Sequence, residues 1–253
     1  MIAGMHVGKY VKYDTGHYMK KILGVIGGMG PEATAYFYEE IIAHTKALKD
    51  QDHINMVILN CASMPDRTEA IKSGKHDELL ATMKAEIEKL EKCGAGNIAI
   101  PCNTSHYFMD RIREMTDIPV INMIDETARY VAEGEIKAKK VGILATDGAI
   151  STGLYQKACS DHGLVAEVPD PDSQKKVMSL IYDDIKAGKM GDEDKFHDAV
   201  TNLQSKGCNV IILGCTELSV YKKHHKVPIH CVDALDVLVR ESIIRSGAEY
   251  EEL

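Results

Sequence analysis

Two cysteines each follow directly after a predicted buried strand and are followed in turn by polar residues. The first lies in the run Cys102-Asn103-Thr104 and the second in the run Cys215-Thr216-Glu217. Ligands of open α/β sheets bind at the carboxyl ends of the strands, so both thiols are expected to face one cleft. If each cysteine also opens a helix, the positive end of the helix dipole lowers the pKa of the thiol and favours the thiolate.

Two thiols on opposite sides of one carbon atom could exchange its proton. One group removes the proton while the other delivers a proton to the opposite face. A free cysteine is more often a small buried hydrophobic residue, and we prefer that interpretation for Cys61, Cys93, Cys159, Cys208 and Cys231. The repeated order of strand, cysteine and polar residue favours a catalytic role for the other two.

Short apolar runs alternate with longer segments of helical spacing along the whole chain. The runs begin at Lys21, Ile54, Asn97, Ile118, Lys140, Leu164, Asn209 and Val227. This alternation predicts βα units and parallel sheets. The segment 77–92 carries apolar residues at helical spacing and is expected to pack them against a sheet; they are Leu79, Leu80, Met83, Ile87 and Leu90.

The two halves of the chain resemble each other. KILGVIGGMG near residue 21 matches KVGILATDG near residue 140, and NIAIPCNT near residue 97 matches NVIILGCTE near residue 209. We infer an internal duplication, and the predicted fold class is α/β with two similar lobes and the active site between them. The predicted boundaries are an extension or cloning artefact at 1–18, a first lobe at 19–117 plus 232–253, and a second lobe at 118–231.

Composition excludes several classes of protein. A formal charge of -8, from 30 basic and 38 acidic side chains with no basic run, argues against nucleic-acid binding. No apolar stretch approaches the roughly 20 residues that a membrane-spanning helix needs. Seven cysteines without a CxxC pair predict no structural metal site and favour reduced thiols in a cytoplasmic protein.

Four motifs together resemble the aspartate/glutamate racemase family. They are GGMGP at 27–31, PDRT at 65–68, PCNTSH at 101–106 and GCTEL at 214–218, and their order and spacing agree with the family from about Lys20 onward. The resemblance implies an enzyme that needs neither pyridoxal phosphate nor another cofactor. It also implies a homodimer whose substrate lies between the lobes, with one catalytic cysteine from each lobe.

The resemblance also assigns charged residues to the site. Asp66 and Glu217 match the acids that accompany the two thiols, although a turn residue and a first-turn helix acid are the ordinary interpretations. Arg67 matches the ligand of the distal carboxylate, a role that its planar guanidinium suits. Lys175, in SQKKVM, matches a second cation, and the alternative is an exposed helix face.

Uncharged residues complete the predicted binding site. The turn around Met29 approaches the substrate through its backbone in the family, and it lacks the GxGxxG spacing of a nucleotide loop. Asn103, Thr104, Ser105 and Thr216 could donate to the α-carboxylate or simply cap helices. Thr146 is a further predicted contact, and Asp147 beside it is expected to bring a carboxylate near the cleft.

These observations predict a racemase that interconverts L- and D-aspartate, with glutamate as the second choice. Cys102 and Cys215 are the predicted acid/base pair, and the expected partner is a small acidic amino acid or dicarboxylate. Two alternatives stay open at this point. One is another carboxylate enzyme of the same superfamily, of the maleate isomerase or hydantoin racemase type, and the other is a carboxylate-binding protein without catalysis.

Overall fold

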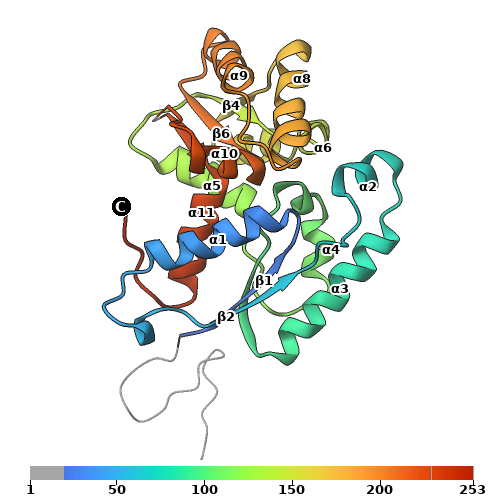
Figure 1. Ribbon diagram of the computed structural model, residues 1–253, viewed down its shortest axis with the longest axis vertical. Helices are drawn as coiled ribbons and strands as arrows, with labels where there is room; N and C mark the ends of the chain where they lie inside the picture. Colours follow the sequence, from blue (N-terminus) through green and yellow to red (C-terminus); the bar gives the residue numbers. More distant parts are fainter. Residues whose placement is uncertain (1–19, 229, 253) are drawn as a thin grey trace, which may run out of the picture.

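The computed structural model describes residues 20–228 and 230–252, so the predicted extension at 1–18 lies outside the described residues. Two parallel sheets, each flanked by helices, form two lobes that lie one above the other in Figure 1. The predicted α/β fold with two similar lobes is therefore confirmed. No helix in the described ranges is both long enough and apolar enough to cross a membrane.

The first sheet contains β1 (Ile22–Gly27), β2 (Met56–Asn60) and β3 (Ala95–Ala99), in the order β2-β1-β3. The connecting helices are α1 (Pro31–His44), η1 (Asp50–Asp52), α2 (Arg67–Ser73) and α3 (Asp77–Lys92). All five apolar residues that were predicted to form the buried stripe of α3 are buried. Helix α3 packs them against β1 and β3.

The second sheet contains β4 (Lys140–Leu144), β5 (Val165–Glu167), β6 (Val210–Leu213) and β7 (Cys231–Asp233), in the order β5-β4-β6-β7. Its helices are α6 (Asp147–Ser151), α7 (Leu154–Asp161), α8 (Pro171–Ser179), α9 (Glu193–Ser205) and α10 (Thr216–His224). Helix α8 continues into one π-helical turn, η3 (Leu180–Ile185). Turns of this kind are frequent at functional sites.

The two sheets share one strand order, as the predicted duplication requires. Strands β2, β1 and β3 correspond to β5, β4 and β6, and Val120 forms a parallel bridge to Ile98 at the position that β7 has in the second sheet. The predicted strand from Ile118 is thus a single bridge. Pro119 cannot donate to a ladder because it has no N–H, and the Asn122 side chain caps the next helix, so the pairing stops there.

Two helices that follow the crossings between the lobes pack against each other. They are α5 (Met123–Glu133) and α11 (Ala234–Arg245), and both lie between the lobes in Figure 1. Arg129 of α5 contacts Glu241 of α11 at 3.2 Å, and Arg245 of α11 pairs with Glu126 of α5. Because Glu126 and Glu241 are buried, this ionic cluster ties the two helices together.

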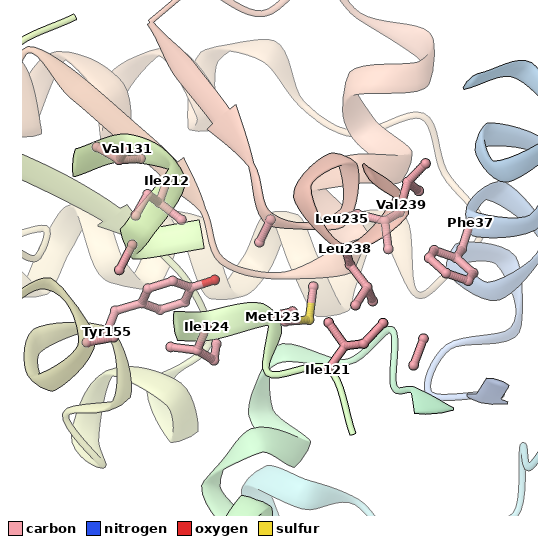
Figure 2. Packing of buried hydrophobic residues seen from close by; sticks show 14 of the residues in the cluster. Phe37, Ile121, Met123, Ile124, Val131, Tyr155, Ile212, Leu235, Leu238 and Val239 are labelled. Carbon is pink, nitrogen blue, oxygen red and sulfur yellow. The ribbon is translucent and has the colours of Figure 1, made fainter. Parts of the chain in front are cut away.

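A central hydrophobic cluster contains residues of both sheets. Leu23 and Val25 of β1 belong to it together with Val141 and Ile143 of β4, and Figure 2 shows how residues from α5 and α11 fill its middle. The lobes therefore share one core, and each has a separate outer core as well. The lobe boundaries remain a prediction. Because Val120 pairs with Ile98 of the first sheet, we propose that the chain crosses to the second lobe after Val120.

Candidate active site

The two cysteine loops meet at one cavity. Cys102 follows β3 and precedes the 3-10 helix η2 (Asn103–Phe108), which continues into α4 (Met109–Arg113), whereas Cys215 follows β6 and precedes α10. Both cysteine side chains are 6% exposed, and both line the same cavity. The expectation that the two thiols face one cleft is confirmed.

Most of the predicted site residues line this cavity. They are Met29, Asp66, Arg67, Cys102, Asn103, Thr104, Thr146, Cys215, Thr216 and Glu217, joined by Thr68, Tyr182 and Lys186. Two predicted residues do not reach it. Ser105 is buried behind it with its hydroxyl 3.5 Å from the sulfur of Met29, and Lys175 is exposed on α8, where it pairs with Asp172 at 2.9 Å.

The cavity at the two thiols is small. Its volume is about 20 Å³, which is about enough for one water molecule and too small for an amino acid. A wider cavity of about 390 Å³ adjoins it and shares Met29, Asp66, Arg67, Lys186 and Glu217 with it. An amino acid therefore fits between the thiols only if the walls of the smaller cavity move apart.

Glu217, which is buried, joins the second thiol to the partly exposed cation of Lys186. The thiol of Cys215 donates to Oε2 of Glu217 at 2.9 Å, and Nζ of Lys186 donates to Oε1 of the same carboxylate. Burial, followed by the charge of Glu217, raises the pKa of Cys215 well above its ordinary value. Cys215 is thus a thiol at neutral pH. The prediction that the helix dipole lowers its pKa is wrong, because desolvation outweighs the dipole.

The first thiol has the cation of Arg67 beside it. Arg67 is the first residue of α2, and its guanidinium is fixed by hydrogen bonds to the carbonyl oxygens of Pro65 (3.0 Å) and Met64 (3.3 Å). Burial alone would lower the pKa of Arg67, but the charges of Cys102 and Asp66 raise it on balance, as does a hydrogen bond to the Cys102 side chain. Arg67 is therefore a permanent positive charge at this thiol.

Asp66, the acidic residue before Arg67, has a structural role and also lines the cavity. Asp66 caps α2 by accepting from the backbone N–H of Glu69 at 2.8 Å. This bond orients the helix so that Arg67 begins it and faces the cavity.

In the part of the chain that the structure describes, no group of three or more His, Cys, Asp or Glu side chains is arranged to hold a metal ion.

Hydroxyl and amide groups from both lobes cover the remaining wall. The hydroxyls of Thr104 and Thr146 are 3.1 Å apart across the lobe interface, and Thr146 also caps α6. The Nδ2 of Asn103 is buried without a hydrogen-bond partner among the described residues. Asp147 does not line the cavity: its Oδ1 accepts from Gln174 at 2.9 Å, so its carboxylate lies outside the site.

The π-helical turn brings two residues to the cavity that were not predicted from the sequence. Lys186 follows η3 directly, and the hydroxyl of Tyr182 in η3 lies 3.4 Å from the hydroxyl of Thr68 in the other lobe. Their spacing of four residues is the only signal in the sequence. A regular α-helix continued from Lys175 would place them differently, and the π turn cannot be recognised from residue types.

The residues 26–242 match the family model described as "Asp/Glu/Hydantoin racemase". This match spans most of the chain and includes both cysteine loops. The chain belongs to the Asp/Glu/hydantoin racemase family. The predicted resemblance is confirmed, and so is the prediction of an amino-acid racemase at the level of this family.

Individual relatives agree with this assignment. The chain is 27% identical to a broad-specificity amino-acid racemase, RacX, of Bacillus subtilis, over 88% of this chain and 96% of the relative. It is similar in structure to an aspartate racemase of Picrophilus torridus, with a TM-score of 0.78, 30% identity and coverage of 91% and 96%. An aspartate racemase homologue of Pyrococcus horikoshii shares the fold, with a TM-score of 0.73 and 24% identity over 90% and 100% of the chains.

His106, four residues after Cys102, supports the racemase site without lining the cavity. Its Nε2 accepts from the backbone N–H of Met123 at 3.2 Å, so Nδ1 carries the proton and donates to the carbonyl of Cys102 at 2.9 Å. Burial lowers the pKa of His106 to about 4. The neutral ring therefore joins the Cys102 loop to the beginning of α5.

This burial predicts an acid-dependent loss of stability. Because the pKa of His106 is lower in the folded state than its ordinary value of about 6.5, its contribution is complete above pH 6.5 and is lost as the pH falls toward 4. We expect a loss of about 3 kcal/mol over this range. Urea unfolding of wild type and His106→Gln at each pH measures the difference, and equal pH dependence in the two proteins would contradict the assignment.

Proposed function

We propose that this racemase interconverts L- and D-aspartate, with glutamate as a weaker substrate, by a two-base exchange between Cys102 and Cys215. The observation that supports it most is the meeting of two buried thiols, one from each half of the duplication, at a single cavity. Their surroundings differ in charge. A guanidinium lies beside Cys102 and a carboxylate beside Cys215.

The proposed reaction uses this difference. Cys102, which lies beside Arg67, acts as the base and takes the α-proton, so that the C–H bond breaks and an S–H bond forms. Cys215, which is protonated because burial raises its pKa, gives its proton to the opposite face, and a new C–H bond forms with inverted configuration. After the product leaves, Cys102 releases its proton to water and Cys215 takes one from water, and Glu217 accepts the hydrogen bond of the restored thiol. For the other enantiomer the two cysteines exchange roles.

Two cations favour a substrate with a second carboxylate. Arg67 and Lys186 both line the cavity, and Nε of Arg67 is buried without a partner among the described residues. The amide of Asn103 and the N–H groups at the start of α10 are available to the α-carboxylate. The choice of aspartate over glutamate is supported by the structural similarity to the aspartate racemase of Picrophilus torridus.

Comparison of aspartate with asparagine tests the proposed substrate. Asparagine has nearly the same shape but no distal charge, and a hydrogen bond to a charged group contributes about 1.5–3 kcal/mol. We therefore expect kcat/KM for L-aspartate to exceed that for L-asparagine by about tenfold to a hundredfold, measured by chiral chromatography without added cofactor. Equal rates for the two substrates would contradict an acidic specificity and favour a broad one.

Other activities of the superfamily would appear in the same experiment. A maleate isomerase or hydantoin racemase would leave aspartate unchanged and act on those compounds, and a binding protein would leave every substrate unchanged. The presence of two thiols at one cavity argues against simple binding, which needs neither. A homodimer and a cytoplasmic location stay predictions that gel filtration and cell fractionation can test.

A further inference from the structure

Tyr155 contacts both cysteine loops although it does not line the cavity. It belongs to α7 and is 1% exposed, and Figure 2 shows its ring in the central core among residues that include Ile124 and Ile212. A core position of this kind needs only an apolar ring. The hydroxyl of a buried tyrosine needs a hydrogen-bond partner. We therefore expect the hydroxyl of Tyr155 to have a role beyond packing.

The hydroxyl of Tyr155 fixes the orientation of one side chain at the first cysteine. It donates to Oδ1 of Asn103 at 2.5 Å, across the lobe interface. Because the amide oxygen is used in this bond, the amide nitrogen is turned away from Tyr155. That nitrogen has no partner among the described residues, although Asn103 is 2% exposed and lines the cavity. A buried donor without an acceptor is costly, which points to a ligand oxygen at this place.

The ring of Tyr155 fixes the backbone before the second cysteine. A Cβ atom added at Gly214 would lie 2.7 Å from Cε2 of Tyr155 and 3.2 Å from Cβ of Ala145. Only glycine allows this close approach without displacing the ring. Tyr155 therefore contacts the residue that follows Cys102 and the residue that precedes Cys215.

We propose that Tyr155 is a positioning residue that sets the two cysteine loops relative to each other and turns the Asn103 amide toward a substrate carboxylate. The inference rests on the proposed function, since it assigns Tyr155 a part in the same site. It makes two separable predictions. The hydroxyl governs the affinity for a carboxylate through Asn103, and the packing of the ring on Gly214 governs the rate through the placement of Cys215.

Tyr155→Phe tests the first prediction because it keeps the ring and removes only the hydroxyl. We expect KM for aspartate and the dissociation constant of succinate, an unreactive dicarboxylate, to rise about tenfold, equivalent to about 1.4 kcal/mol, while kcat changes less than threefold. Tyr36→Phe, which alters a buried tyrosine of α1 outside the site, is the matched control and should leave both constants unchanged. Unchanged constants in Tyr155→Phe would overturn the proposal.

A double-mutant cycle identifies the partner of the hydroxyl. If Tyr155 acts through Asn103, then Asn103→Ala raises the dissociation constant of succinate, and adding Tyr155→Phe to it causes no further rise. Two effects that multiply would overturn the inference. A melting temperature that falls while KM stays constant would show that Tyr155 only stabilises the fold.

Gly214→Ala tests the second prediction. We expect the added methyl group to displace the ring or the Cys215 loop, so that kcat falls at least tenfold while the binding of succinate changes little. The failure of this inference can be distinguished from the failure of the proposed function. A wild-type protein that does not racemise aspartate contradicts the function, whereas an active wild type with unaffected variants contradicts only the role of Tyr155.

Discussion

Replacing either Cys102 or Cys215 by serine is expected to reduce racemisation of aspartate by about a thousandfold in both directions. General acid/base groups contribute about 10²–10⁴-fold to a rate, and a serine hydroxyl is far too weak an acid to replace a thiol. Each turnover uses both thiols, so the loss should be similar for the two variants. The initial rates from L- and D-aspartate, followed by chiral chromatography, measure it.

The binding of a dicarboxylate should survive these substitutions. Sulfur and oxygen differ little in size, and neither thiol is the proposed ligand of a carboxylate, so the dissociation constant of succinate should change less than threefold. Cys93→Ser is the matched control, since Cys93 is an exposed cysteine that does not line the cavity. Full activity in either site variant would contradict the two-base account.

The second large effect is expected at Lys186. Replacement by methionine keeps the length of the side chain and removes the charge that pairs with Glu217 and is proposed to bind the distal carboxylate. Removing one member of a buried charge pair costs about 2–5 kcal/mol. Because Glu217 is buried but the Lys186 side chain is 27% exposed, we expect a loss near the lower limit, which is a fall in kcat/KM for aspartate of about thirtyfold. Part of that loss arises because Glu217 is left without its cation beside Cys215.

Lys175→Met is the control that separates the two lysines. The family resemblance favoured Lys175 as the second cation, but the structure places it on the exposed face of α8, paired with Asp172. We expect its replacement to change kcat/KM less than twofold. A large loss in Lys175→Met together with a small loss in Lys186→Met would reverse the assignment and require a different arrangement of α8 and η3.

The sequence predicted the architecture well because the information was local. Fully apolar strands and helices with one apolar stripe, such as α3, are visible in residue order. The sequence matches between the halves predicted a duplication, and the strand order that the two sheets share agrees with it. The run from Ile118 was the exception. Whether a short apolar run pairs over several residues or only at Val120 depends on neighbouring strands and on Pro119, and residue type alone does not decide that.

Residues of the site could be predicted from the sequence only where they lie in a recognisable motif. The cysteine loops and the PDRT motif led to the thiols and to Arg67, which the structure brings together at the cavity. Lys186 and Tyr182 could not be found, because a π-helical turn sets their direction. The direction in which the pKa of Cys215 shifts could not be predicted from the sequence either. It depends on burial and on the distance to Glu217, and the sequence contains neither.

The most direct test of the two-base account follows the α-proton of aspartate by proton NMR in deuterium oxide, with reduced protein and no added cofactor. Starting from L-aspartate, the account predicts loss of the α-proton signal together with the appearance of deuterated D-aspartate, while the L-aspartate that remains stays largely protonated early in the reaction. Early deuterium in the unreacted L-aspartate would point to a single base, and a signal that persists while the protein is folded and reduced would contradict the account.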